Sequence, residues 1–389
     1  MTSWVRTALV VLAVGLAACA PRGPEGTGAW LGEPEELAPG VTFYRTSDPE
    51  LVAHAGPIAV SLVRVDPARA RLASVLSQGT VLDAEAVTDV ARRHNALAAI
   101  NGGFFNRHNG EPTGLLKVDG EIVSDSSLPR GVVIVHSPPG GPVSLEFDRL
   151  AAKMTMHFET PAGPKAVPID GVDTTRARGR LMLYSPGYYP DTDTAPTGTE
   201  WVVAGDPLRV QSVRVAAGRT PIPPDGVVLS YGGTELPADL EKLQPGVEVQ
   251  FTTEWRSLFG VSETALERAH HIVNGAGLLR RQSTRLTDWE DEALDPDTFI
   301  DARHPRTMIG VDRDGLIWLA AVDGRQPDYS IGMTFEDLHR LADRLDLTGA
   351  LNLDGGGSTT MVVRGQVVNR PSDPAGARPV GDALIVTAR

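Results

Sequence analysis

The stretch from Ala350 to Val363, with the sequence ALNLDGGGSTTMVV, constrains the fold of this chain more than any other segment. A short apolar run ends in Asn352 and Asp354, three consecutive glycines follow, and a second apolar run begins at Met361. Two short apolar runs on either side of such a turn predict two β-strands. Because glycine accepts positive φ and lets other groups approach the main chain closely, the turn predicts a polar site held between strands. A tight turn with a capping Asp is the alternative interpretation.

Two further apolar runs end in glycine-containing junctions. Leu97–Ile100 leads into Asn101-Gly102-Gly103, and Ile272-Val273 leads into Asn274-Gly275. The whole chain contains 41 glycines and 30 prolines among its 389 residues, which predicts many turns and short strands rather than long helices. The predicted fold class is therefore α+β, with a core of mixed or antiparallel sheet and few helices.

The middle of the chain has its own pattern. Between about residues 140 and 255, short strand-like runs alternate with Pro and Gly, which predicts an additional β-rich part inserted in, or packed beside, a domain spanning 41–389. Residues 186–198 and 285–302 are expected to be loops. The clearest helix is predicted at 334–345, where Thr334 and Asp337 form a capping box.

The N-terminus carries an export signal. Arg6 precedes the apolar run Ala8–Ala18, which is too short to span a membrane as a stop-transfer helix. The run ends in Leu-Ala-Ala-Cys19, which resembles a bacterial lipobox, and Cys19 is the only cysteine of the chain. The sequence thus predicts a lipoprotein signal peptide over 1–19, a lipid anchor at Cys19 and a flexible tether over 20–40. The alternative is an ordinary export signal with an accidental cysteine.

The expected location is the bacterial cell envelope, lipid-anchored to a membrane and facing outside the cytoplasm. The formal net charge of −13 argues against nucleic acid or an anionic lipid surface as the main partner, because no basic stripe supplies phosphate contacts. The mature chain has no cysteine nucleophile, and no Cys-x-x-Cys or His-x-x-x-His metal pattern is present. Walker A, Rossmann and Gly-x-Ser-x-Gly patterns are absent as well.

Polar side chains gather instead at the ends of predicted strands, where a shared sheet would bring them into one pocket. Arginine suits a phosphate or carboxylate because its planar fork donates parallel hydrogen bonds. Aspartate can act as acid, base, nucleophile or metal ligand, and amides suit sugar hydroxyls. The set indicates an anionic, carbohydrate-like ligand, with plain ion pairs as the alternative. Its members are Asn101, Asn274, Arg306, Asp323, Arg325, Asn352, Asp354 and Asn369.

An ordered series of motifs resembles the phosphodiester glycosidase family. That family includes a lysosomal enzyme that uncovers mannose 6-phosphate and bacterial proteins associated with exopolysaccharide biosynthesis. The resemblance runs from about residue 97 to residue 386, and no motif matches between about 140 and 255. The motifs are Asn101–Phe105, Arg306-Thr307 with Gly310, Asp323–Arg325, Gly332–Thr334, Asn352–Thr359, Asn369 and Pro371–Asp373.

The resemblance implies hydrolysis of the glycosidic bond of a sugar-1-phosphodiester in envelope or exopolysaccharide metabolism. A non-catalytic lipoprotein that binds anionic polysaccharide is the alternative, and a scaffold with internal ion pairs is a third hypothesis. The sequence itself requires no cofactor, and a divalent cation held by Asp354 and Asp323 is compatible with it. The expected partners are the carbohydrate phosphodiester and, through Cys19, a membrane.

For this reaction the chemistry of the residues suggests definite roles. Asp354 would act on the anomeric carbon or on its attacking water, with Asp323 as a second carboxylate, while Arg306 and Arg325 would hold the phosphate. The expected catalytic residues are therefore Asp354, Asp323 and Arg306. The expected substrate-binding residues are Asn101, Gly102, Gly103, Arg325, Asn352, Gly355, Gly356, Ser358, Thr359 and Asn369.

Overall fold

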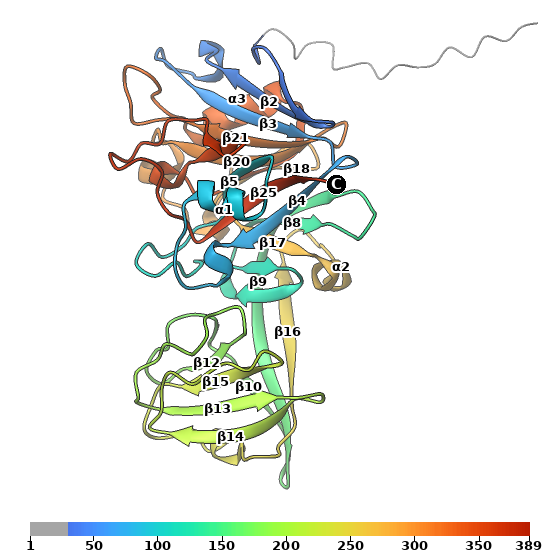
Figure 1. Cartoon of the computed structure of the whole chain (residues 1–389), viewed down its shortest axis with the longest axis vertical. Helices are drawn as coiled ribbons and strands as arrows, with labels where there is room; N and C mark the ends of the chain where they lie inside the picture. The colour runs from blue at the N-terminus through green and yellow to red at the C-terminus, as the bar shows by residue number, and fades with distance from the viewer. Residues whose placement is uncertain (1–29) are drawn as a thin grey trace, which may run out of the picture.

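The computed structural model describes residues 30–389, so the predicted signal peptide and Cys19 lie outside the described residues. Strands dominate this part of the chain, and they pair into four sheets, almost entirely antiparallel. Three α-helices accompany them among the described residues. The predicted α+β class with few helices is confirmed. Figure 1 shows a large upper body and a smaller lower part, joined by two long strands.

An eight-stranded antiparallel sheet crosses the upper body. Its central strands are buried along their whole length, as their nearly continuous apolar sequences require. In order across the sheet, the strands are β1 (Glu35–Ala38), β2 (Val41–Thr46), β3 (Val60–Val65), β21 (Ile317–Val322), β20 (Arg306–Asp312), β22 (Leu347–Asn352), β18 (Leu278–Arg281) and β19 (Thr284–Arg285).

A five-stranded sheet lies beside it and brings the N- and C-terminal parts of the chain together. The alternating burial of one strand, Ala70–Leu76, shows that only one of its faces meets the core. The strands, in order, are β24 (Gln366–Val367), β23 (Met361–Val363), β5 (Ala98–Asn101), β25 (Asp382–Ala388) and β4 (Ala70–Leu76).

A third sheet of seven strands extends from the upper body into the lower part. Its strand β9 has 17 residues and pairs along much of its length with β16 (Val249–Ser257), so the two form the link visible in Figure 1. The other strands are β10 (Gly163–Pro168), β8 (Ser126–His136), β17 (His271–Asn274), β6 (Leu116–Val118) and β7 (Glu121–Ser124), and β9 spans Ser144–Thr160.

The lower part is a five-stranded sheet with its own apolar core. Trp201 is fully buried there, and its indole Nε1 donates to the Leu243 carbonyl at 2.9 Å. Met156 and Phe158 of β9 belong to the same core cluster. The β-rich middle segment is therefore confirmed. Its strands, in order, are β11 (Gly171–Val172), β12 (Leu181–Tyr184), β15 (Gly226–Tyr231), β13 (Thr199–Ala204) and β14 (Arg209–Val215).

The helices are short and cover sheet faces. Helix α3 (Phe335–Arg344) packs Phe335, Leu338 and Leu341 into the same core cluster as Trp318 of the eight-stranded sheet. The predicted capping box is present, because the Thr334 hydroxyl accepts from the Asp337 N–H and the Asp337 carboxylate accepts from the Thr334 N–H. Helices α1 (Val87–Arg93) and α2 (Glu263–Arg268) are the other two.

The described part of the predicted tether over 20–40, residues 30–40, belongs to the folded domain instead, because Leu31 is buried and β1 pairs with β2. The acidic segment 285–302 contains short helical turns, and the fully buried Glu292 fixes it to the core. The Glu292 carboxylate accepts from the N–H groups of Gly131, Gly277 and Leu278 at 2.7–3.0 Å.

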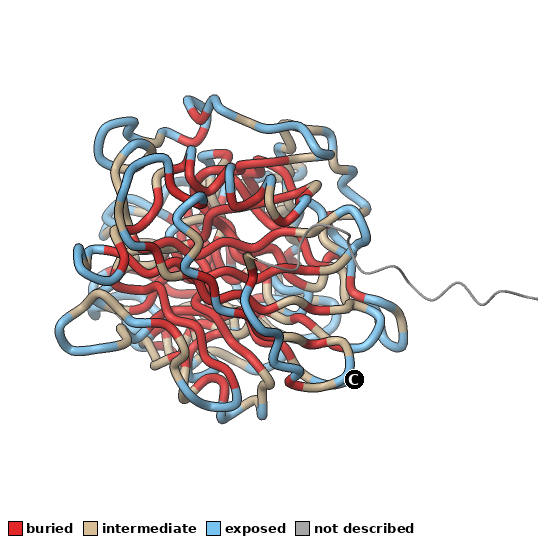
Figure 2. The backbone as a smooth tube through the Cα atoms, turned by 90° about the horizontal axis from the view of Figure 1, so that it is seen from above, coloured by how far each residue is buried: buried red, intermediate tan, exposed pale blue. Residues whose placement is uncertain are grey.

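The core is continuous through the centre of the upper body. In the view from above, buried backbone fills the middle of the molecule and exposed residues form the peripheral loops (Figure 2). Within residues 30–389, none of the helices has the length and apolar character needed to cross a membrane.

Candidate active site

Two of the three predicted strand-to-glycine junctions meet at one place. Strands β5 and β22 belong to different sheets, and β5 ends at Asn101 while β22 ends at Asn352, two residues before Asp354. The Asn101 side-chain amide donates to the Asp354 carbonyl at 2.7 Å, and the Asp354 N–H donates to the Gly102 carbonyl at 3.3 Å. The Asn101 carbonyl oxygen of the side chain accepts from Thr307 at 2.8 Å. Asn101 therefore fixes the main chain around Asp354.

A cavity of about 250 Å³ opens at this junction. Four arginines and one carboxylate line it, so its wall is strongly positive in a chain whose net charge is −13. The lining residues are Phe104, Arg107, Phe299, His304, Pro305, Arg306, Arg325, Asn352, Asp354, Gly355, Gly356, Gly357 and Arg378.

Asp354 supplies the carboxylate. Its Oδ1 accepts from the Gly355 N–H at 2.8 Å. Burial raises the pKa of Asp354 to about 6, although hydrogen bonds from Ser358 and Gly355 and the charge of Arg378 act in the opposite direction. The carboxylate is thus ionised near neutral pH while it keeps an unusually high affinity for a proton. That combination suits a base or a nucleophile.

Arg325 and Arg107 provide positive charge that the protein does not neutralise. Both side chains are exposed, and in the described part of the chain neither has a carboxylate oxygen within 4.0 Å. Arg325 Nη2 donates to Nδ1 of His304 at 3.2 Å. Arginines held beside a cavity without an acidic partner favour an anionic ligand, above all a phosphate that can accept two parallel hydrogen bonds.

His304 orients Arg325. Its Nε2 faces the Thr298 carbonyl at 2.9 Å and must donate, because a carbonyl oxygen only accepts. Nδ1 is then the acceptor for Arg325, and burial lowers the pKa of His304, which agrees with a neutral ring. Gly356, at φ +62°, lies against the guanidinium; a Cβ there would lie 3.2 Å from two of its nitrogens. Glycine at this position therefore leaves space for Arg325.

Arg306 has a different environment from the one expected. It is buried, its Nε donates to the Met333 carbonyl at 2.9 Å, and its Nη2 donates to the carbonyls of Phe299 and Ala302 at 2.6 and 2.9 Å. Burial and the charge of Arg325 lower the pKa of Arg306 to about 9. Three carbonyl acceptors make Arg306 mainly a brace for the 299–306 loop. It also lines the cavity and adds positive charge to its wall.

Arg378 is a site residue that the motifs did not indicate. Its Nε donates to Asp373 at 2.9 Å, and its Nη1 lies 3.4 Å from the Ser358 hydroxyl. The guanidinium passes directly over Gly357, where any side chain would collide with it. Asp373 thus neutralises Arg378, in contrast to Arg325 and Arg107.

Asp382 lies directly behind the cavity. Its two carboxylate oxygens accept from the Gly103 N–H at 3.0 and 3.2 Å, and a Cβ at Gly102 would overlap the carboxylate. Burial raises the pKa of Asp382 to about 7, and the nearby charge of Asp354 adds to the effect. Gly102 and Gly103 were expected to touch substrate, yet both are buried against Asp382. They shape the wall that carries Asp354.

Two buried amide atoms near the site have no partner in the described part of the chain. Asn352 Nδ2 donates to the carbonyls of Ala276 and Leu353, which leaves Oδ1 without a hydrogen bond. Asn274 Oδ1 accepts from the Phe104 N–H, which leaves its Nδ2 unpaired. Unpaired buried polar atoms cost about 1–3 kcal/mol each, so they commonly serve a ligand or a water. Asn352 lines the cavity and can accept from a ligand hydroxyl or N–H.

Asp323 and Asn369 lie away from the cavity. The Asp323 carboxylate is buried and accepts from Asn369 Nδ2 at 2.9 Å, from the Arg370 N–H at 2.9 Å and from the Tyr329 hydroxyl at 3.3 Å. Asn369 also accepts from the Met361 N–H at 2.7 Å. These contacts use the polar atoms expected to meet substrate. Asp323 and Asn369 therefore support the Asp354 loop, because Asn369 bonds its main chain at Thr359 and Met361.

The arrangement of Asp323 also bears on the predicted cation. Asp354 lines the cavity and Asp323 does not, so the two carboxylates do not face one common ligand position. Over residues 30–389, no group of three His, Cys, Asp or Glu side chains is placed to hold a metal ion.

The cavity unites Asp354, Arg306, Arg325, Asn352, Gly355 and Gly356 from distant segments. The supporting shell contains Asn101, Gly102, Gly103, Ser358 and Thr359, all of which are buried. The residues missed are Arg107, His304, Arg378 and Asp382. Arg107 and His304 lie within two residues of predicted motifs, which was the available signal.

Comparison with known proteins identifies the part of the chain that carries most of this site. Residues 197–387 match the family model described as phosphodiester glycosidase. This part of the chain is therefore similar to phosphodiester glycosidases. The match includes Arg325, Asp354 and Arg378, whereas the loop from Asn101 to Arg107 lies outside it.

A curated relative of the phosphodiester glycosidase part is N-acetylglucosamine-1-phosphodiester alpha-N-acetylglucosaminidase of Mus musculus, with 35% identity over 102 residues. The matched region is 26% of this chain and 19% of that protein, so the chain spans about a fifth of the relative's length. The Homo sapiens protein of the same name is 31% identical over 102 residues, again 26% of this chain and 19% of that protein.

Solved structures extend the likeness to nearly the whole chain. A hypothetical protein from Synechocystis has a TM-score of 0.74 with 22% identity, covering 92% of this chain and 64% of that one. A protein from Burkholderia pseudomallei has a TM-score of 0.73 with 25% identity, covering 86% and 75%. The first match shows a shared fold alone. The chain thus shares its fold with proteins from Synechocystis and Burkholderia pseudomallei.

Proposed function

We propose that the protein is a hydrolase that cleaves the glycosidic bond of a sugar-1-phosphodiester. The observation that carries the proposal is the pairing, in one cavity, of a carboxylate with a pKa of about 6 and of arginines without acidic partners. Arginines without an acidic partner favour an anionic ligand, and a carboxylate that can act on carbon or on water suits a reactive centre beside that anion. In a sugar-1-phosphodiester, the anomeric carbon is the reactive centre and the phosphate bonded to it is the anion.

The phosphate would lie against Arg325 and Arg107. Arg325 is already oriented by His304, so its donors do not have to be ordered when substrate binds. Arg306 and Arg378 add positive charge around the same position. As the glycosidic bond breaks, negative charge grows on the departing phosphate, and these guanidinium groups stabilise it.

Asp354 would attack the anomeric carbon or activate the attacking water. Among the described residues it is the only carboxylate that lines the cavity. One carboxylate is sufficient here, because a phosphate monoester departs as a stable anion and needs little protonation. The anomer released first distinguishes a covalent intermediate at Asp354, which gives retention, from direct attack by water, which gives inversion.

The sugar would contact the remaining wall of the cavity. Asn352 Oδ1 is free to accept from a hydroxyl or from an acetamido N–H. Phe104 is half-buried and lies 6.1 Å, ring centre to ring centre, from Phe299, so the pair offers an apolar surface for a sugar face.

The test is release of free sugar from UDP-N-acetylglucosamine and from an aryl phosphodiester of a sugar. We expect hydrolysis by the wild type, a loss of at least about a thousandfold in kcat for Asp354→Asn, and a rise in KM for Arg325→Ala. Arg180→Ala serves as a control, because Arg180 is an exposed arginine of the lower part, away from the cavity. Binding of an anionic polysaccharide without turnover by the wild type would instead favour a binding lipoprotein.

We also propose an envelope location with a lipid at Cys19 and a role in envelope or exopolysaccharide metabolism. The support is the sequence: a short apolar run ending in a lipobox-like Leu-Ala-Ala-Cys. In a bacterial host, radiolabelled palmitate should enter the wild-type protein and should not enter Cys19→Ala. Equal labelling of both would contradict the anchor and would leave the hydrolase proposal unaffected.

A further inference from the structure

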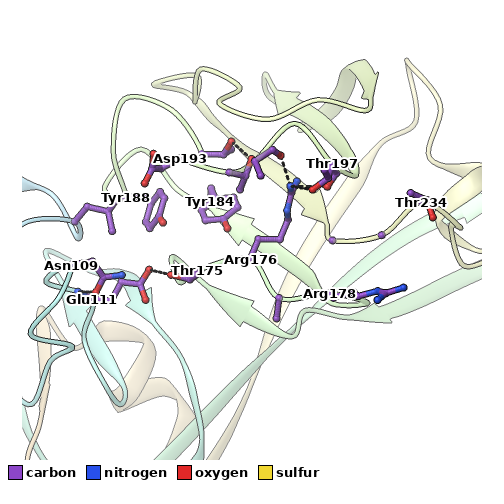
Figure 3. A pocket seen from close by; sticks show the side chains of 17 residues that line it. Asn109, Glu111, Thr175, Arg176, Arg178, Tyr184, Tyr188, Asp193, Thr197 and Thr234 are labelled. Carbon is purple, nitrogen blue, oxygen red and sulfur yellow. Dashed lines mark hydrogen bonds between the residues drawn. The ribbon is translucent and has the colours of Figure 1, made fainter.

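A second cavity, of about 570 Å³, lies where the upper body meets the β-rich lower part. One loop connects it to the candidate active site: Phe104 and Arg107 line the first cavity, and Asn109 and Glu111 line the second. The loop is fixed, because the Asn106 N–H donates to the Glu111 carbonyl at 2.7 Å. Figure 3 shows Asn109 and Glu111 on one side of this cavity and the tyrosines and Arg176 of the lower part on the other.

Glu111 is a buried acid without a basic partner. Its side chain is 6% exposed, and it accepts from the hydroxyls of Thr175 at 2.7 Å and Thr174 at 3.2 Å. In the described part of the chain, no Lys, Arg or His nitrogen lies within 4.0 Å of its carboxylate. A carboxylate offers about four acceptor positions, so Glu111 retains capacity for two further donors. Burial without a cation is costly unless those donors arrive.

Tyr188 supplies an unused hydroxyl on the opposite wall. Its ring is buried and lies 4.6 Å from the ring of Tyr184. The Tyr184 hydroxyl donates to the Thr174 carbonyl at 3.0 Å, whereas the Tyr188 hydroxyl has no acceptor among the described residues. Burial, with the neighbouring Tyr184 and Glu111, raises the pKa of Tyr188, so the phenol stays neutral and can donate.

The two arginines of this cavity differ in whether the protein already uses their hydrogen-bond donors. Arg176 is committed, because it donates to the Ser230 hydroxyl at 2.9 Å and to the Thr197 carbonyl at 2.7 Å, and it lies 3.5 Å from Glu200. Arg178 is exposed and forms no ion pair in the described part of the chain. The side-chain amide nitrogen of Asn109 is also unused there, since its oxygen accepts from the Glu111 N–H at 3.3 Å.

We propose that this cavity binds a saccharide unit of a glycan chain attached to the substrate, an inference that rests on the proposed function. The free groups are an acceptor carboxylate, a phenol and an amide donor, spread over facing walls. A sugar ring carries several hydroxyls that donate and accept at once, so it can satisfy all of them together. The cavity volume lies within the roughly 300–1,000 Å³ typical of small-molecule sites.

A metal ion fits these walls less well than a sugar does. Over residues 30–389, no three metal-binding side chains converge in this cavity or elsewhere. A small phosphate would leave Glu111 unpaired, since two anions repel each other. The shared loop adds a functional reason, because a glycan bound at Glu111 would reach the loop that carries Arg107.

The binding test uses fluorescent tetrasaccharides of N-acetylglucosamine, glucose and galactose, which contain no phosphodiester bond, with the Asp354→Asn protein as the parent of the variants. We expect at least one to bind and to bind about tenfold more weakly to Tyr188→Phe, which loses only a hydroxyl. Tyr231→Phe is the matched control, since Tyr231 lies in the same part of the fold and outside the cavity. The proposal would be overturned if no tetrasaccharide bound. It would also be overturned if the Asp354→Asn protein bound equally well with and without the Tyr188→Phe substitution.

Kinetics separate this proposal from the proposed function. With hydrolysis established, Tyr188→Phe and Glu111→Gln should lower kcat/KM for a sugar phosphodiester that carries an oligosaccharide. The same variants should leave the rate with a single-sugar substrate unchanged. Absence of hydrolysis by the wild type would contradict the active-site proposal, whereas equal effects on both substrates would contradict the second cavity.

Discussion

At the scale of single residues, the site depends on how the protein treats charge. Asp354 is kept partly out of water, while Arg325 is held in position by a neutral histidine and has no acid to neutralise it. The cavity therefore has a preference for an anion in a position beside the Asp354 carboxylate. Substrate binding would satisfy that preference and place the anomeric carbon next to Asp354.

The pH dependence of kcat/KM should report the ionisation of Asp354. Since the carboxylate must be ionised to act, we expect kcat/KM to fall below a pH of about 6, by about tenfold per pH unit. The hydrogen bond from Ser358 lowers the pKa of Asp354, so Ser358→Ala should move this acidic limb to higher pH. A limb near pH 4 in both proteins would show that another group controls the rate.

Some residues of the candidate site could be predicted from the sequence, and others could not. The motif residues Asp354, Arg325 and Asn352 do line one cavity, as the strand-end argument predicted. Asp323 does not line the cavity, because a carboxylate at a strand end can equally well accept from neighbouring main-chain N–H groups. Arg378 and Asp382 could not be predicted from the sequence, because their importance comes from contacts across the fold with Gly357 and Gly103.

At the scale of elements, apolar periodicity and capping residues predicted helices reliably, whereas the packing of irregular segments could not be predicted from the sequence. Helix α3 followed from its apolar face and its capping box. Strand β1 was missed because Glu35–Ala38 has little strand character, and its place in the sheet comes from pairing with β2. The segment 285–302 was predicted as a loop, but its sequence did not indicate that Glu292 anchors it to the core, buried with main-chain donors around its carboxylate.

Removal of the Glu292 carboxylate should therefore be severe. Glu292 accepts from Gly131, Gly277, Leu278 and the Nε of Arg149, so Glu292→Ala leaves buried donors and a guanidinium unpaired. We expect the free energy of unfolding to fall by about 3–5 kcal/mol, measured by urea denaturation. Glu290→Ala, an exposed neighbour, should change it by less than about 0.5 kcal/mol. Similar values for both variants would contradict this role.

At the scale of the whole molecule, two bodies share one loop and two long strands. The upper body holds the charged cavity, and the lower part supplies most of the second cavity. The sequence predicted the β-rich middle from its Pro and Gly punctuation. It could not predict that Asn109 and Glu111 would face residues of that middle segment, because only the folded chain brings them together.

Stability should also respond to pH through buried acids. Burial raises the pKa of Asp173 from 3.8 to about 8 and that of Asp382 to about 7, so the folded protein keeps protons that the unfolded chain releases. This contribution is present at low pH and is lost as pH rises through the folded pKa. The buried His271 and His339, with pKa values lowered to about 4, are neutral in the folded protein above pH 6.5, and in the unfolded chain they are mostly neutral above about pH 7.

Between about pH 7 and 8 the buried acids therefore dominate the slope of stability against pH. We expect the free energy of unfolding to fall across this range, by up to about 1.4 kcal/mol per pH unit for Asp173. Denaturant titrations at several pH values measure it, with Asp173→Asn as the comparison. The variant should show a clearly shallower slope, and an unchanged slope would assign the effect to other groups.

The central claim is that the bond between the sugar carbon and the phosphate oxygen is the one that breaks. Hydrolysis of a sugar phosphodiester in water enriched in oxygen-18, followed by mass spectrometry of both products, measures this directly. If Asp354 acts at the anomeric carbon, the label must appear in the hydroxyl of the released sugar, and the phosphate must stay unlabelled. Label in the phosphate would mean attack at phosphorus and would contradict the account.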